Sequence, residues 1–190
     1  MVDQREVDNL LPLALSRPRE ALTKARAILA NRPGPYEASV AHHAAGIVLR
    51  EFGDVEASVS ELRNALRLAR LTASAEREVE VLAALGVALA FAGRTQAGLA
   101  AFDRAVRLSR GVLAGHVLHR RSVVLWTLGQ HAAALDDARR AITMLRRAGD
   151  TLWTARALTA RGLAYLAMGQ PAAEPSPARS WPRSAGVRPS

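Results

Sequence analysis

Cysteine does not occur in this chain of 190 residues, which excludes disulfide bonds, thiolate metal sites and cysteine nucleophiles within it. Aromatic residues are also scarce, at 4% of the sequence, although 49% of the residues are hydrophobic. A core made from these residues must therefore consist mainly of Ala, Leu and Val. Side chains of this size allow helices to stack closely.

Proline is missing from the middle of the chain: all nine prolines lie before residue 36 or after residue 170. Because proline inside a helix costs about 3 kcal/mol, its exclusion predicts helical structure throughout 36–170. Apolar residues at helical spacing also predict a helix over 19–30, with a helix over 3–15 as its partner. We therefore expect a degenerate helical hairpin at 1–35, a helical array at 36–170 and a disordered Pro-, Arg- and Ser-rich tail at 171–190.

Long apolar runs are absent as well, and lysine occurs once. No stretch approaches the roughly 18 apolar residues of a membrane span, and the opening MVDQREVD is too polar for a secretion signal, so we expect a cytoplasmic protein without membrane contact. The net charge is +9, and a basic surface is the usual footprint of nucleic-acid binding. Here, however, the arginines are spread beside acidic residues and few aromatic rings could stack on bases, so specific nucleic-acid binding is not expected.

Glycine, by contrast, returns at a nearly regular interval of 40, 36 and 40 residues, at Gly53, Gly93, Gly129 and Gly169. A second small residue lies seven positions before each of them, at Gly46, Gly86, Ser122 and Gly162. Such a period is typical of stacked repeats of two helices. We expect the later glycine of each pair at a turn with positive φ, followed by a helix cap such as Asp54 or Thr95. The earlier small residue should lie where two helices cross closely.

The segments 44–66, 84–106, 120–142 and 160–170 resemble tetratricopeptide repeats. The family pattern is met in the second and fourth segments, by Leu85, Gly86, Leu89, Phe102, Ala105, Gly162 and Tyr165. No segment has the leading Trp of the family, its closing Pro is missing, and Ser58 and Gly98 replace a preferred Ala. The resemblance implies an all-α fold of antiparallel helical hairpins, about three and a half units stacked as a right-handed solenoid.

The opening REVDNLLPLALSRPREALTKARAILA and the string VLREFGDVEASVSELRNALRLAR are similar to the N-terminal repeat region of actinobacterial CHAT-domain proteins. In that family a caspase-like peptidase domain follows helical repeats. Prolines after residue 170 interrupt the fourth segment after its first helix, so we expect a truncated or frameshifted relative of a longer protein, with a natural disordered tail as the alternative. The His and Cys dyad of the family would lie beyond this chain, which without cysteine is expected not to be an enzyme.

The resemblance also implies a binding surface, because the first helix of each hairpin lines the concave groove of a tetratricopeptide superhelix. Counting from the small residues gives these groove candidates: His43, Arg50, Glu80, Phe91, His116, His119, Trp126 and Arg156. Packing between neighbouring repeats is the alternative role for Phe91 and Trp126. The residues directly after the small positions are apolar, at Ile47, Val87, Val123 and Leu163, where repeats that clamp a C-terminal carboxylate use polar side chains. Capture of a C-terminal carboxylate is therefore not expected.

No catalytic motif or metal-ligand set accompanies these residues. His116 and His119 could share a helix face, but neither they nor the adjacent His42 and His43 have enough further ligands for a metal, and Asp136–Asp137 are expected on an exposed helix start. We expect a non-catalytic scaffold that binds a protein or peptide segment without cofactors or metals, and that self-associates through its open C-terminal end. A sensory module of a transcription regulator and an Arg-rich nucleic-acid binder are the alternatives.

Overall fold

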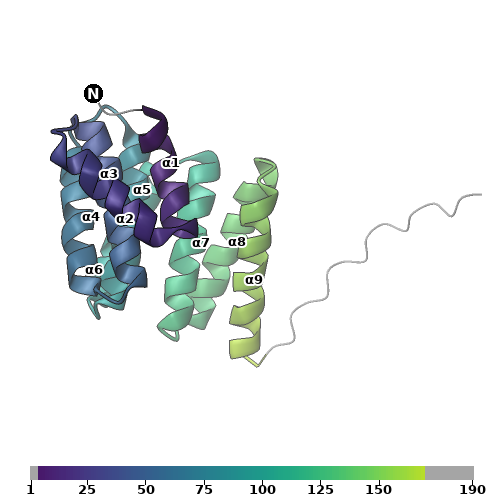
Figure 1. Ribbon diagram of the computed structural model, residues 1–190. Helices are drawn as coiled ribbons and strands as arrows, with labels where there is room; N and C mark the ends of the chain where they lie inside the picture. Colours follow the sequence, from purple (N-terminus) through teal and green to yellow (C-terminus); the bar gives the residue numbers. More distant parts are fainter. Residues whose placement is uncertain (1–3, 170–190) are drawn as a thin grey trace, which may run out of the picture.

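The computed structural model describes residues 4–169 (Figure 1). This part of the chain forms nine α-helices and no strand, which confirms the all-α class expected from the sequence. The helices are α1 (Gln4–Ser16), α2 (Pro18–Ala30), α3 (Pro35–Glu51), α4 (Val55–Ala69), α5 (Ala75–Phe91), α6 (Thr95–Leu108), α7 (Gly111–Thr127), α8 (His131–Arg147) and α9 (Thr151–Ala167). The disorder expected at 171–190 lies outside the described residues.

Positive-φ glycines end helices at all four predicted positions. Gly53, Gly93, Gly129 and Gly169 have φ angles of +85°, +72°, +74° and +66°, and no atom lies within 4 Å of where their Cβ would be. Glycine is required there by backbone conformation and not by lack of space. Asp54 caps α4 as predicted, since its carboxylate accepts a hydrogen bond from the N–H of Ala57 at 3.2 Å. The cap predicted at Thr95 is wrong: Thr95 is already inside α6, and no side chain caps that helix.

Two of the earlier small residues lie at close helix crossings, as predicted. A Cβ on Gly46 would be 2.6 Å from Cγ of Leu62, and a Cβ on Gly86 would be 2.8 Å from the ring of Phe102. Neither gap could hold even a methyl group unless the facing side chain, Leu62 or Phe102, moved. At Gly162 on α9, by contrast, no other atom of the described residues, outside the local backbone of α9 itself, lies within 4 Å of the Cβ position. The same sequence feature therefore has a packing partner in two hairpins and none on α9.

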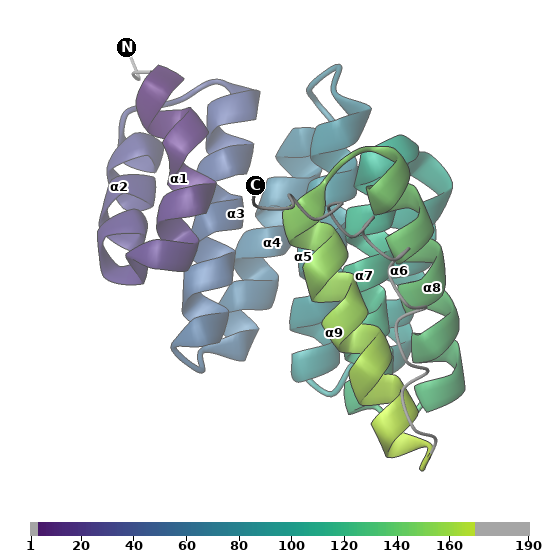
Figure 2. The same cartoon turned by 90° about the vertical axis from the view of Figure 1, so that its right-hand side faces the viewer.

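Consecutive helices pack in pairs: α1 with α2, α3 with α4, α5 with α6 and α7 with α8. The odd-numbered helices continue from pair to pair, since α3 contacts α5, α5 contacts α7 and α7 contacts α9. Within residues 4–169, α4, α6 and α8 make no such contacts with one another. Figures 1 and 2 show the pairs following one another from α1 and α2 to α9. The odd helices therefore lie closer together than the even ones.

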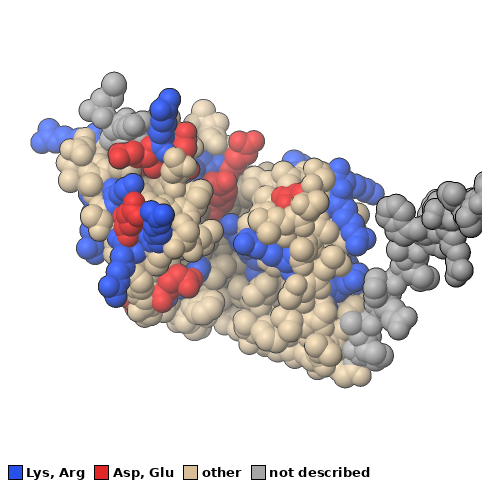
Figure 3. Space-filling view, turned by 45° about the vertical axis from the view of Figure 1, so that its right-hand side comes forward, with Lys and Arg blue, Asp and Glu red and all other residues tan. Residues whose placement is uncertain are grey.

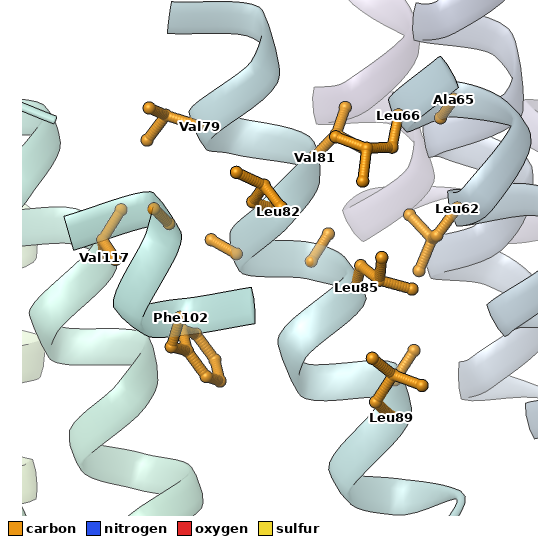
Figure 4. Packing of buried hydrophobic residues seen from close by; sticks show 14 of the residues in the cluster. Leu62, Ala65, Leu66, Val79, Val81, Leu82, Leu85, Leu89, Phe102 and Val117 are labelled. Carbon is orange, nitrogen blue, oxygen red and sulfur yellow. The ribbon is translucent and has the colours of Figure 1, made fainter. Parts of the chain in front are cut away.

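The largest cluster of buried apolar residues joins α4, α5, α6 and α7 (Figure 4). Most of its members are Ala, Val and Leu, and its one aromatic residue, Phe102, is fully buried. Burial of a side chain of that size contributes about 1.5–3 kcal/mol, and the missing side chain of Gly86 is what makes room for it. The scarcity of aromatic residues in the sequence is thus matched by a core of small side chains.

One sequence expectation about charged residues is wrong. Asp136 is exposed as expected, but Asp137 is only 3% exposed. Its two carboxylate oxygens accept hydrogen bonds from Arg121 on α7, at 2.6 Å and 2.8 Å. Asp137 lies in the second turn of α8 and faces α7, so the pair joins the two helices of one hairpin. Hydrogen bonding to Asp137 raises the pKa of Arg121, which stays charged.

Candidate functional site

A cavity of about 320 Å³ lies on the odd-numbered helices, where α5, α7 and α9 meet. Its apolar wall is formed by Val87 and Phe91 from α5, by Val123 and Val124 from α7 and by Trp153 from α9. Phe91 is 64% exposed and Val123 is 41% exposed. Apolar side chains of this size are usually covered when they cluster, so they mark a surface suited to a partner.

A second cavity of about 270 Å³ continues the first toward the N-terminal helices. It adds Leu11 and Leu15 from α1, together with residues of α3, and it shares four lining residues with the first cavity: Val87, Arg120, Trp153 and Arg156. Figure 3 shows the molecular surface hollowed between its two halves, with basic and acidic side chains in and beside the hollow. We call the two joined cavities the groove. Its lining comes from all five odd-numbered helices.

Trp153, in the first turn of α9, lies at the junction of the two cavities and is surrounded by basic side chains. The guanidinium carbons of Arg120 and Arg156 lie 5.4 Å and 4.8 Å from its ring centroid, within the range of a cation–π contact. The imidazole of His116 lies 4.5 Å from the same ring, and that of His119 meets it edge-on at 5.5 Å. The ring thus fixes the side chains that carry the charge of the groove.

Three arginines, Arg50, Arg120 and Arg156, line the groove, and buried Arg77 contacts two of its lining residues, His43 and Glu80. Arg77 and Arg50 have carboxylate partners. Arg77 is buried and donates to the carboxylate of Glu80 at 2.9 Å, and Arg50 pairs with Glu51 at 2.7 Å. Within residues 4–169, Arg120 and Arg156 make no salt bridge and no side-chain hydrogen bond. Burial lowers the pKa of Arg120, and the charges of Arg50 and Arg156 lower it further, against the opposite effect of Glu80.

His119 also faces the groove, and the structure keeps it neutral. Burial lowers its pKa to about 4, and the charges of Arg120, Arg156 and His116 act in the same direction. Its Nδ1 atom is buried without a hydrogen-bond partner. A buried polar atom of this kind costs about 1–3 kcal/mol, so this side chain is held in place by its neighbours and not by its own hydrogen bonds.

The structure brings six of the eight predicted groove residues to the groove. Those that line it are His43, Arg50, Glu80, Phe91, His119 and Arg156. His116 lies behind Trp153, where its Nε2 contacts the Asp150 carboxylate at 2.8 Å, and lines neither cavity. Trp126 also lies elsewhere: like Tyr165, it packs against the apolar cluster of α7, α8 and α9. The alternative role of packing between neighbouring helices thus describes Trp126, while Phe91 is largely exposed.

Arg120 and Trp153, which line both cavities, are absent from the groove residues predicted from the sequence. Arg120 follows His119 directly, so counting around the helix puts it on another face, yet its long side chain reaches Trp153. Trp153 lies close to the start of α9, outside the range counted from Gly162. A search for aromatic residues in the first turn of each odd-numbered helix would have returned Trp153 together with Tyr36 of α3.

The described part of the chain contains neither a candidate metal site nor a candidate membrane span. Residues 4–169 contain no group of three or more His, Cys, Asp or Glu side chains placed to hold a metal ion. None of the described helices combines the length and apolarity needed to cross a bilayer. Comparison with known proteins finds no matching family model and no matching curated protein.

Proposed function

We propose that this protein is a non-catalytic scaffold that binds a segment of another protein in the groove formed by its odd-numbered helices. The observation that carries the proposal is the continuity of the groove, whose two cavities share Val87, Arg120, Trp153 and Arg156 and take lining residues from α1 to α9. A surface that crosses five helices suits an extended chain better than a small molecule. Its exposed apolar residues supply area to bury, and its arginines supply polar contacts at interface positions where Arg is favoured.

We also propose that the helical pairs form a helical-repeat solenoid of the tetratricopeptide type. The support is the order of contacts, in which the odd helices touch along the series while the even helices do not. Such an arrangement curves the stack and leaves the odd helices on the inner side. The repeated pairs of small residue and turn glycine support the same arrangement.

A place as the regulatory repeat region of a CHAT-type peptidase or of a signalling protein belongs to the same proposal. Its support is the sequence resemblance alone. In such a protein, the groove with its apolar and basic residues would bind the segment that controls the effector domain. No step of catalysis is assigned to residues of this chain.

Selection of peptides on the intact protein tests the proposed binding function. Random twelve-residue peptides displayed on phage are selected on the immobilised chain, and the enriched peptides are synthesised and measured by fluorescence anisotropy. Phe91→Ala should weaken their binding at least fivefold, because an interface anchor contributes more than about 1 kcal/mol. Phe52→Ala is the matched control, since Phe52 caps α3, is 50% exposed and lies outside both cavities.

Two results would overturn the proposal. One is that no peptide is enriched over an unrelated helical protein. The other is that Phe91→Ala and Phe52→Ala reduce the affinity equally, which would place the binding surface outside the groove. Circular dichroism and thermal unfolding of both variants show whether each keeps its fold.

A further inference from the structure

The groove carries excess positive charge, and this excess lies at Arg120 and Arg156. Arg77 and Arg50 have carboxylate partners in Glu80 and Glu51. Arg120 and Arg156 have none within the described residues, although both line both cavities. Two guanidinium groups held against one indole ring, beside an apolar wall, repel each other unless an anion lies between or beside them.

We propose that Arg120 and Arg156 form an anion-recognition point at the junction of the two cavities, and that the occupant of the groove is an acidic peptide segment whose Asp or Glu side chain is flanked by apolar residues. This inference rests on the proposed binding function and names its ligand. Guanidinium groups recognise carboxylates by paired hydrogen bonds. The apolar residues on either side, Phe91 and Val123 in one cavity and Leu11 and Leu15 in the other, suit apolar neighbours of that acid.

The contacts of the two arginines make them suited to this role. Trp153 fixes both groups before a ligand arrives, which reduces the entropy lost on binding. Arg120 is partly buried, so its charge is less screened by water than that of a surface arginine. The carboxylate of Glu80 lines the same wall. Its negative charge disfavours a phosphate dianion more than a single carboxylate, and this favours an unphosphorylated acidic segment.

The position of the two arginines differs from that of the polar residues expected in a C-terminal carboxylate clamp. Three of the four residues directly after the small positions, Ile47, Val87 and Val123, are apolar and line the groove. The charge comes instead from arginines on α7 and α9 at other positions. A carboxylate inside a peptide, with chain on both sides, fits a junction that has an apolar cavity on each side of it.

The test uses the enriched twelve-residue peptides described above and the full-length protein at physiological salt. Each peptide is compared with a version in which its acidic residue is changed to the amide. On the unmodified protein, loss of the acid should weaken binding about tenfold. On the double variant Arg120→Gln/Arg156→Gln the same change should have less than a twofold effect, since the coupling between acid and arginine is gone. Arg63→Gln/Arg67→Gln is the matched control, because these two arginines are exposed on α4, and it should keep the tenfold difference.

The outcomes separate the ligand assignment from the binding function. Enriched peptides without an acid, or an acid whose loss weakens binding equally on both proteins, would overturn the anion-recognition point while the groove remains a binding surface. Tighter binding of a phosphoserine version than of the Asp or Glu version would overturn the choice of a carboxylate. Submicromolar binding of a fluorescein-labelled single-stranded RNA that is lost in the double variant would overturn the choice of a peptide. Arg156→Gln alone, at an exposed position, repeats the comparison if the double variant fails to fold.

Discussion

The guanidinium of Arg77 donates a hydrogen bond to Nδ1 of His43, at 2.9 Å, across the boundary between α5 and α3. Arginine has only donors, so this nitrogen accepts and the imidazole carries its proton on Nε2. Burial lowers the pKa of His43 well below its ordinary value, and the charge of Arg77 lowers it further. The same arginine donates to the hydroxyl and the carbonyl of Ser39. One buried arginine therefore joins two hairpins and keeps a histidine neutral.

Acid should destabilise the protein through its histidines. Folding lowers the pKa of His119 to about 4, from about 6.5 in the unfolded chain. Between these two pH values the unfolded chain binds a proton at His119 and the folded chain does not. The free energy of unfolding therefore falls as the pH drops through this window and changes little above it. His43 acts in the same direction. Urea unfolding at pH 7 and pH 4.5 measures the loss, and His119→Gln should make it smaller. An equal loss in that variant would contradict the assignment.

Substitution by alanine should have opposite effects on stability at Gly86 and at Gly162. Gly86→Ala places a Cβ 2.8 Å from the ring of Phe102 and 3.1 Å from the carbonyl oxygen of Gly98, so we expect destabilisation of about 1–3 kcal/mol. Gly162→Ala meets no atom within 4 Å, so it should stabilise by up to about 1 kcal/mol through helix propensity. Thermal unfolding of the two variants checks the difference. Destabilisation by Gly162→Ala would show that a neighbour occupies that face of α9.

The buried pair between α7 and α8 should matter more than its exposed neighbour. Asp137→Ala removes two charge-assisted hydrogen bonds but leaves the guanidinium of Arg121 with Asp103 as its remaining partner, so we expect destabilisation of about 1.5–3 kcal/mol. Asp136→Ala removes a carboxylate that is exposed and 3.9 Å from Arg140, for which about 0–1 kcal/mol is expected. Chemical denaturation of both variants gives the comparison. Equal effects would mean that the burial of Asp137 has no energetic consequence.

Self-association should depend on the exposed leucines of α9. Leu152, Leu163 and Leu166 on this helix are 60%, 40% and 68% exposed, and apolar residues gathered on one helix drive association. We expect the sedimentation coefficient of the protein to rise with concentration in the micromolar range. Leu163→Glu/Leu166→Glu should abolish this rise, and Leu71→Glu, at an exposed site between α4 and α5, should not. A monodisperse monomer at all concentrations would contradict the expectation.

The turns of this fold were predictable because their signal is local. A positive φ at Gly53 or Gly93 depends on one residue, and so does the exclusion of proline from helix interiors. The groove was harder to predict, because one residue step turns a helix by about 100°. Thr127 lines the cavity while Trp126 packs against α8 and α9. The pairing of Arg121 with Asp137 joins two helices, and no residue spacing within either helix predicts it.

The crossing residue and the turn glycine of each hairpin have consequences for evolution. The two positions are seven residues apart in all four cases, from Gly46–Gly53 to Gly162–Gly169. This distance corresponds to about two turns of helix. Selection acts differently on the two positions: close crossings such as those at Gly46 and Gly86 disfavour any side chain, whereas a turn at positive φ accepts Gly or Asn. Core Ala, Leu and Val can exchange freely within their volume. Distant relatives of this chain should therefore retain this seven-residue pairing, repeated every 36 to 40 residues, after most other similarity has been lost.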